Sequence, residues 1–405
     1  MMAALSLASE APGVQSEQIS DPMLLNLLAC AALAVWIYLV AGRGGFWIAA
    51  ERDDGGPAPK AWPAVTVVIP ARDEAEGVGE TVGSLLRQDY PGALAIVLVD
   101  DQSTDATAEV ARHAAAGQGT ADHLTVLSGA PLPSGWTGKL WAMKQGIERA
   151  QAGEPAYLLL TDADIVYDRD ALSRLVAKAQ DQDLVLTSWM VKLRCESFAE
   201  RALIPAFIFF FLMLYPFAWV NRRDRATAAA AGGCMLVSRE ALNAAGGIES
   251  IRGALIDDCA LAERLKAQGP IWLGLTERAR SIRPYPEFGD IRRMVARSAY
   301  AQLRYSPMLL AGTVAGMALI YLAPVLLALF GYGLGQSAGL LAWAAMAIVF
   351  QPVLRFYGHS PLWGPFLPAI ALAYMAFTLD SAYQHSQGRG GLWKGRAQAN
   401  LDGAR

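Results

Sequence analysis

The feature that most constrains this chain is the uneven distribution of its apolar residues. Residues 24–40 and nearly all of residues 308–382 are apolar, whereas residues 65–200 have the mixed composition of a water-soluble domain. A stretch of about 20 apolar residues is long enough to cross a bilayer. The overall hydrophobic fraction of 54% is also high for a purely soluble protein. The sequence therefore predicts a soluble domain with membrane segments on both sides of it.

The first apolar stretch predicts a transmembrane helix over residues 22–41, after an N-terminal tail of residues 1–21. No Lys or Arg precedes it, whereas Arg43, Arg52 and Lys60 follow. A secretory signal peptide would begin with basic residues, so that interpretation is not favoured. Because cytoplasmic flanks are enriched in Lys and Arg, the soluble domain is expected in the cytosol.

Three further apolar stretches, near residues 309–329, 339–353 and 362–379, predict a cluster of membrane helices within residues 308–382. If all three of these stretches crossed the membrane, the basic tail, residues 383–405, would lie outside the cell. The enrichment of Lys and Arg in cytoplasmic flanks predicts the opposite side. Either one of these stretches is re-entrant or the tail breaks the rule. The side on which the tail lies stays open at this point.

Residues 202–220 are also apolar, and hydropathy alone would assign them to a crossing. Candidate active-site acids lie on both sides of this stretch, at Asp162 and Asp164 before it and at Asp257 and Asp258 after it. A single crossing would separate the two pairs by the bilayer. We therefore predict an interfacial or re-entrant segment, with a core or spanning helix as the alternative.

Residues 62–300 form the predicted soluble domain, in which short aliphatic runs alternate with helical patterns. This alternation predicts an α/β domain with a mostly parallel sheet. Strands are expected at residues 65–69, 95–99, 124–127, 157–160 and 184–187, with a first helix around residues 78–86. Ligands bind such sheets beyond the carboxyl ends of the strands. No GxGxxG or Walker sequence follows any of them, so a dinucleotide-binding or P-loop site is not indicated.

Charge and cysteine content exclude two further classes of protein. The net charge of −3 and the absence of a Lys/Arg-rich run give no support for nucleic-acid binding. The 4 cysteines show no CxxC spacing, so neither a zinc site nor a disulfide framework is indicated.

Asp162 and Asp164 directly follow the fourth predicted strand. At this spacing two carboxylates can reach one hard cation such as Mg²⁺ or Mn²⁺, and a diphosphate can supply further oxygen ligands. The cation would neutralise charge on a departing nucleotide. Helix capping is the alternative role for these residues. Asp100 and Asp101 follow a neighbouring strand and can accept hydrogen bonds from a base or a ribose.

Six short motifs, taken in order, resemble a known family. They are IPARDE at 69–74, VDDQSTD at 99–105, GWTGK at 135–139, TDAD at 161–164, GGC at 232–234 and IDD at 256–258. Over most of its length the chain resembles the membrane-bound family 2 inverting glycosyltransferases with the A-type fold. Within that family it is most similar to the hopene-associated glycosyltransferases, which are related to ceramide glucosyltransferases.

The resemblance implies a GT-A-type nucleotide-sugar-binding domain in a bacterial cytoplasmic membrane. It also implies a donor such as a UDP-sugar, a membrane lipid acceptor and a divalent metal. Asp101 would contact the base, Asp162 the ribose or diphosphate and Asp164 the metal. Asp258 would be the catalytic base, with Asp257 beside it in the catalytic centre.

A base is needed because the acceptor hydroxyl must lose its proton as it attacks the anomeric carbon. Leu261 and Leu265 lie three and seven residues after Asp258, so a helix that begins here can bury an apolar face and keep its acids at the N-terminal edge. Helix capping by the two acids is the alternative.

The first motif adds Pro70, Arg72 and Glu74 to the expected nucleotide-sugar site. Lys139 can hold phosphate oxygens as a point charge, although a solvated surface lysine is an equally good interpretation. Arg297 is the arginine that remains of a Gln/Arg-x-x-Arg-Trp motif found in processive members of the family and in ceramide glucosyltransferases.

Met294 and Ser298 stand where that motif has its Gln and Trp. The departure favours a single transfer over chain elongation. Arg297 can bind a diphosphate in bidentate fashion. For the neighbouring Arg292 and Arg293, contact with anionic lipid headgroups is a nearly equal alternative.

Three functions therefore compete. The leading hypothesis is an inverting glycosyltransferase that moves a single sugar onto a lipid, hopanoid-like in the subfamily that the chain resembles. A processive polysaccharide synthase would use the C-terminal helices as an export channel. A non-catalytic nucleotide-binding membrane protein is the third, because a fold alone does not establish an activity.

Overall fold

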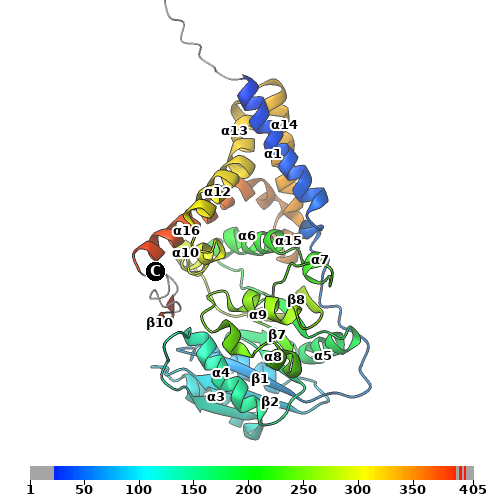
Figure 1. The fold of residues 1–405 in the computed structure, drawn as a ribbon, viewed down its shortest axis with the longest axis vertical. Helices are drawn as coiled ribbons and strands as arrows, with labels where there is room; N and C mark the ends of the chain where they lie inside the picture. Colours follow the sequence, from blue (N-terminus) through cyan, green and yellow to red (C-terminus); the bar gives the residue numbers. More distant parts are fainter. Residues whose placement is uncertain (1–21, 389–391, 395, 398–405) are drawn as a thin grey trace, which may run out of the picture.

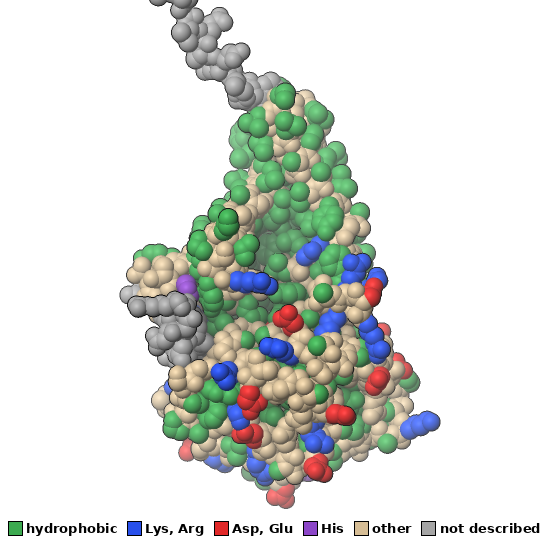
Figure 2. Space-filling model, in the orientation of Figure 1, with side chains coloured by type: hydrophobic (Ala, Val, Ile, Leu, Met, Phe, Trp, Pro, Cys, Tyr) green, Lys and Arg blue, Asp and Glu red, His purple; other side chains and the backbone are tan. Residues whose placement is uncertain are grey.

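The computed structural model describes residues 22–388, 392–394 and 396–397. The predicted N-terminal tail, residues 1–21, and much of the predicted C-terminal tail lie outside these residues. The described part is elongated, with an α/β domain at one end and long helices at the other (Figure 1). Figure 2 shows that hydrophobic side chains cover the helical end, whereas charged side chains gather on and around the α/β domain.

One mixed sheet forms the centre of the α/β domain, with the strand order β3-β2-β1-β4-β7-β6-β8-β5. The strands are β1 Val65–Ala71, β2 Leu94–Asp100, β3 Leu124–Ser128, β4 Tyr157–Leu160, β5 Ile165–Tyr167, β6 Leu186–Lys192, β7 Met235–Ser238 and β8 Ile271–Ser281. Neighbours are parallel except at β4–β7, β7–β6 and β8–β5. The prediction of an α/β domain with a mostly parallel sheet is confirmed.

The five predicted strands correspond to β1 to β4 and β6. All are mainly apolar; β1 is buried along its whole length, whereas the residues of β3 are only partly buried or exposed. The sequence pattern does not predict β5, β7 and β8. The first two have only 3 and 4 residues, and the second half of β8 carries charged residues that hide its strand pattern.

Helices cover both faces of the sheet. They are α2 Val78–Leu86, α3 Thr107–Ala116, α4 Gly138–Gln151, α5 Ala171–Asp181, α8 Arg239–Ala244 and α9 Asp257–Lys266, with the short turns η2 Ala121–His123 and η3 Ile248–Ile251. Apolar residues of α2, α3 and α5 share one core. Those of α4, α8 and α9 belong to a second core. Burial of aliphatic surface on both faces is the main stabilising contribution to a domain of this kind.

The second core continues from the sheet into the long helices. Leu140 of α4 and Leu261 of α9 belong to the same cluster of buried residues as Phe209 and Phe350, which lie in the helical part. The α/β domain and the long helices are therefore packed against each other through a shared apolar core.

The long helices lie at both ends of the chain. They are α1 Pro22–Gly42, α12 Pro307–Met317, the π-helical turn η4 Ala318–Leu322, α13 Ala323–Phe330, α14 Gly333–Val349, α15 Gln351–Phe356 and α16 Leu367–Ser386, with η1 Phe46–Ile48 and η5 Pro361–Phe366 between them. A short hairpin of β9 Leu392–Trp393 and β10 Arg396–Ala397 follows. Within the described residues, 5 segments are long and apolar enough to cross a membrane: Met23–Gly42, Phe198–Val220, Pro307–Phe330, Gly333–Phe356 and Pro361–Ser386.

Three of these segments form a bundle that points away from the α/β domain. α1 packs against α13 and α14, and α13 packs against α14 (Figure 1). The Trp36 indole N–H donates a 2.7 Å hydrogen bond to the Ile320 carbonyl, which lies in the π-helical turn. A π-helical turn misaligns backbone groups, so such a carbonyl is available to a side-chain donor.

The remaining apolar segment before residue 300 contains α6 Phe198–Leu214 and α7 Phe217–Val220, and it is held by the α/β domain at both ends. At its start the fully buried carboxylate of Glu200 accepts hydrogen bonds from the backbone N–H groups of Ser197 and Tyr285. At its end the Asn221 side chain pairs with the backbone of Leu273 in β8. α6 therefore lies across the boundary between the domain and the bundle (Figure 1), beside α10 Phe288–Ala296, which α11 Ala299–Gln302 follows.

Candidate functional site

A cavity of about 700 Å³ lies where the α/β domain meets α6 and α10. One wall carries the acids, and the other carries apolar residues of α6 and β6 together with α10, which contributes Met294 but also the charged Asp290 and Arg293. The polar wall contains Asp162, Asp164, Asp257 and Asp258. Carboxylates gathered in one partly buried cavity are costly unless cations or ligands compensate them. The surroundings of each carboxylate therefore indicate what the site binds.

The local fold brings the two acid pairs together. Asp162 and Asp164 follow β4, at the carboxyl edge of the parallel part of the sheet. Asp257 and Asp258 form the first turn of α9, where the helix dipole favours negative charge. Leu261, one turn further along the same helix, is buried, as the sequence spacing predicted for a helix that keeps its acids at the N-terminal edge.

Lys139 joins the two pairs. Its ammonium lies 2.9 Å from Asp162 Oδ1 and 3.2 Å from Asp257 Oδ2. The lysine is at the start of α4, and its side chain is only 14% exposed. Burial alone would lower the pKa of Lys139, but the charges of Asp162, Asp257 and Asp258 outweigh burial and raise it. Lys139 is thus a buried, charged member of the site rather than a solvated surface lysine.

Asp258 is held by backbone groups. Its Oδ2 accepts a 3.0 Å hydrogen bond from Gly232 N–H, and its Oδ1 accepts one of 2.7 Å from Cys259 N–H. Burial and the neighbouring charge of Asp257 raise the pKa of Asp258 to about 6. The carboxylate therefore has a fixed orientation and a raised proton affinity, and both properties suit a general base.

Arg283 is a site residue that the sequence reasoning did not identify. It follows β8, and its guanidinium reaches Asp164 Oδ2 at 2.7 Å and Glu74 Oε1 at 2.6 Å. The charges of both acids raise its pKa against the opposing effect of burial. A basic residue just beyond a strand end at the ligand-binding edge would have been a usable signal, but β8 was not predicted.

The acids also fit a hard divalent cation. Burial raises the pKa of Asp162; Lys139 opposes this shift, and the charges of Asp164 and Asp257 add to it. Carboxylate oxygens are suitable ligands for Mg²⁺ or Mn²⁺, and in this structure Lys139 and Arg283 pair with one oxygen each of Asp162 and Asp164. In the described part of the chain no group of three or more His, Cys, Asp or Glu side chains is arranged to hold a metal alone. A cation on Asp162 and Asp164 would therefore need ligands from another molecule, as a diphosphate supplies.

The other predicted residues divide into two groups. Pro70, Glu74 and Arg297 line the cavity. Arg72 and Asp101 are not among its lining residues and instead contact each other. The Arg72 guanidinium donates to the Asp101 carbonyl and lies 3.9 Å from its carboxylate, which is fully buried. Arg72 directly follows β1 and Asp101 directly follows β2, so both lie at the carboxyl ends of these strands, next to the cavity.

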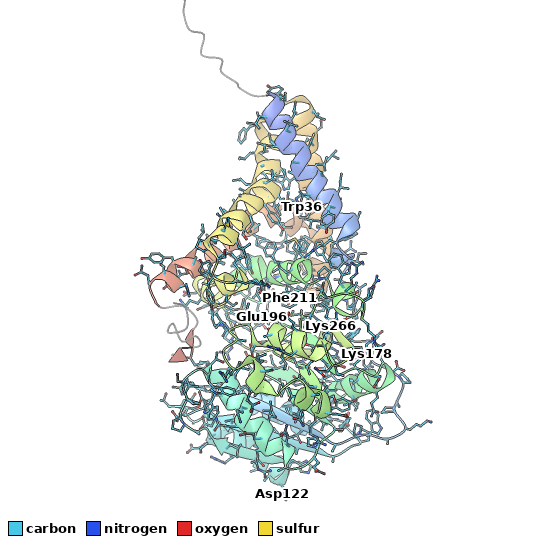
Figure 3. The ribbon with its side chains drawn as sticks, in the orientation of Figure 1. Trp36, Asp122, Lys178, Glu196, Phe211 and Lys266 are labelled. Carbon is cyan, nitrogen blue, oxygen red and sulfur yellow. The ribbon has the colours of Figure 1, made fainter. Side chains whose placement is uncertain are left out.

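The apolar wall faces the acids. Phe207 and Phe211 come from α6, Met190 and Leu193 from the end of β6, and Met294 from α10. Figure 3 labels Phe211 on α6, between the α/β domain below and the helices above. A ligand that fills the cavity would therefore contact charged groups on one side and aromatic and aliphatic groups on the other.

Comparison with known proteins agrees with this architecture. Residues 66–246 match the model of the family described as glycosyl transferase family 2, so this part of the chain carries a domain of that family. A similar curated protein, the 4,4'-diaponeurosporenoate glycosyltransferase of Staphylococcus aureus (strain USA300), is 34% identical over 121 residues. The match covers 29% of this chain and 29% of that relative.

Among solved structures, the mannosyltransferase PcManGT from Pyrobaculum calidifontis, in complex with GDP-Man and Mn²⁺, superposes with a TM-score of 0.52 at 22% identity. The superposition covers 92% of this chain and 100% of that chain. At this level of identity the similarity establishes a shared GT-A-type fold.

Proposed function

We propose that this protein is a glycosyltransferase that moves a single sugar from a nucleotide-sugar donor to a hydroxyl group of a membrane lipid. The observation that carries the proposal is the cavity with two unlike walls. Its acids and cations suit a nucleoside diphosphate and a reacting hydroxyl, and its opposite wall of Phe207, Phe211 and Met294 suits an apolar acceptor.

Asp258 is the proposed general base, with Asp257 beside it. It takes the proton from the acceptor hydroxyl while that oxygen attacks the anomeric carbon from the side opposite the leaving diphosphate, so the configuration inverts. The Gly232 and Cys259 N–H groups hold the carboxylate in place during this step. A pKa of about 6 leaves the base ionised at neutral pH and still able to accept a proton.

Asp162 and Asp164 are the proposed ligands of Mg²⁺ or Mn²⁺, which when bound would neutralise charge on the departing diphosphate. Mn²⁺ is present with GDP-Man in the mannosyltransferase of similar fold. Lys139 and Arg297 line the same cavity and are proposed to bind diphosphate oxygens.

The nucleoside is proposed to lie at the sheet edge formed by the first two motifs. Pro70 and Glu74 line the cavity there, and the pair of Arg72 and Asp101 lies next to it. A UDP-sugar is the proposed donor. Asp101 is proposed to meet the base, because a buried carboxylate can distinguish bases through its hydrogen bonds.

The proposed acceptor is a hopanoid-like or similarly apolar lipid. The name of the staphylococcal relative, a diaponeurosporenoate glycosyltransferase, supports an apolar acceptor. The positions of Met294 and Ser298 beside the cavity, without the Trp of the processive motif, support a single transfer. A polysaccharide synthase would instead give a long product.

The proposed orientation places residues 62–300 in the cytosol of a bacterial cell, with three crossings of the cytoplasmic membrane. These crossings are α1, the segment Pro307–Phe330 and the segment Gly333–Phe356. The segment Phe198–Val220, which contains α6 and α7, lies along the interface, because the domain holds both ends of this segment. α16 lies there too: near its start the ring of Trp363 is 5.9 Å from that of Phe198, and near its end Asp380 lies 3.0 Å from Arg292.

The test uses membranes that contain the protein and a panel of radiolabelled nucleotide sugars. The expected result is label in the lipid extract from one donor, on a product that carries one sugar, and loss of this label when divalent cations are removed. Label in a long polymer would replace the proposal by the synthase alternative. Absence of transfer from every donor would favour a nucleotide-binding protein without catalytic activity.

A further inference from the structure

The chain beyond α16 returns to the α/β domain. Lys394, in the turn between β9 and β10, donates a 2.8 Å hydrogen bond from its ammonium to the Asp73 carbonyl. The ammonium also lies 3.2 Å from Glu74 Oε1. In the opposite direction, Arg72 Nε donates a 3.3 Å hydrogen bond to the Lys394 carbonyl. Three contacts thus connect this turn to the segment that follows β1.

These contacts bring Lys394 to the cavity that contains the acids, where it is one of the lining residues. Its partner Glu74 is also bound by Arg283, and Arg283 reaches Asp164. Lys394 is therefore the outer member of a row of alternating charges that leads to the proposed metal ligand. No element of the α/β domain supplies this cation, which comes from a position more than 300 residues later than its partners.

The ammonium of Lys394, which lines the cavity, has more N–H donors than its contacts with Asp73 and Glu74 use. An ammonium group has three N–H donors, and the contacts with Asp73 and Glu74 account for two of them. Its side chain is 27% exposed, so it is not sealed inside the protein. A partly exposed ammonium on the wall of a cavity that is proposed to hold a diphosphate is a suitable partner for phosphate oxygens.

We propose that Lys394 binds the diphosphate group of the nucleotide donor, so that the C-terminal turn forms part of the donor site. The inference rests on the proposed function, because it assigns a contact within the same cavity. A purely structural role, in which Lys394 only anchors the tail to Asp73 and Glu74, is the competing explanation.

The experiment measures the dissociation constants of UDP and GDP by calorimetry with the full chain in detergent, for wild type, Lys394→Met, Lys394→Arg and Lys60→Met. Lys60 is an exposed lysine that does not line the cavity and serves as the matched control. Loss of one charged contact is expected to weaken nucleotide binding by about tenfold or more in Lys394→Met. Lys394→Arg should restore most of the affinity, and Lys60→Met should bind like wild type.

The outcomes separate the explanations. Wild-type affinity in Lys394→Met would overturn the inference, whatever its effect on the melting temperature. Equal weakening in Lys394→Met and Lys394→Arg, with a lower melting temperature in both, would show a structural anchor and also overturn it. Failure of the wild-type chain to bind either nucleotide would overturn the proposed donor, and this inference with it.

Discussion

At the scale of single residues, Asp258 combines a carboxylate that the Gly232 and Cys259 N–H groups hold in place with a pKa that burial and Asp257 raise to about 6. A general base works in its ionised form, so activity is present above this pKa and is lost as the pH falls through it. We expect kcat/KM for the donor to fall about tenfold per pH unit below pH 6. The measurement is transfer between pH 8 and pH 5, and a flat profile over this range would contradict the assignment.

Residue spacing was sufficient to predict most of the acidic wall. Asp162 and Asp164 follow a strongly apolar strand, and Asp257 and Asp258 begin a helix with an obvious buried face, so local patterns indicated their positions. The ion pairs between these groups were not predictable in the same way. Arg283 lies 119 residues from Asp164, and only the pairing of the strands between them brings the two together.

At the scale of elements, α6 depends on the buried carboxylate of Glu200. Glu200→Ala would leave the N–H groups of Ser197 and Tyr285 without this acceptor. We expect the variant to lose about 2–4 kcal/mol of stability, because buried N–H groups without partners are costly. The measurement is thermal unfolding in detergent. The matched control is Glu196→Ala, since the Glu196 side chain is 69% exposed, and equal melting temperatures for the two variants would contradict the expectation.

The elements that the sequence predicted best were those with the strongest periodicity or the longest apolar run. β1, β2, α2 and α1 are of this kind. The short strands β5 and β7 have too few residues for a pattern. Hydropathy does not separate the segment that contains α6 from a membrane crossing, because this segment is as long and apolar as the helices proposed to cross. Long-range contacts with Tyr285 and Leu273 distinguish α6 from the bundle.

At the scale of the whole molecule, the proposed orientation also accounts for the basic C-terminal tail. In that proposal three crossings before α16, and none by α6 or α16, would return the chain to the side of the α/β domain, where Lys394 contacts Asp73. The positive-inside rule and the count of crossings then agree. Under the proposed orientation, the conflict in the sequence would come from counting α16 as a crossing, because its hydropathy resembles that of the other apolar helices.

Single cysteines test this orientation in a variant that lacks the native free cysteines. In intact cells, an impermeant maleimide is expected to label Tyr332→Cys, in the turn between α13 and α14, where the tyrosine is 64% exposed. Ser360→Cys, just before α16, and Asp122→Cys, at the far end of the α/β domain (Figure 3), should be labelled only after cell disruption. Labelling of Ser360→Cys but not Asp122→Cys in intact cells would show that the proposed orientation is wrong.

The central claim is that the cavity between the α/β domain and α6 catalyses sugar transfer with Asp258 as its base. The most direct measurement compares Asp258→Asn with the exposed-surface control Asp122→Asn for transfer rate and for nucleotide affinity. Removal of a general base costs about 10²–10⁴-fold in rate. We predict this loss for Asp258→Asn with nucleotide affinity retained, and no loss for Asp122→Asn; near-normal turnover by Asp258→Asn would contradict the account.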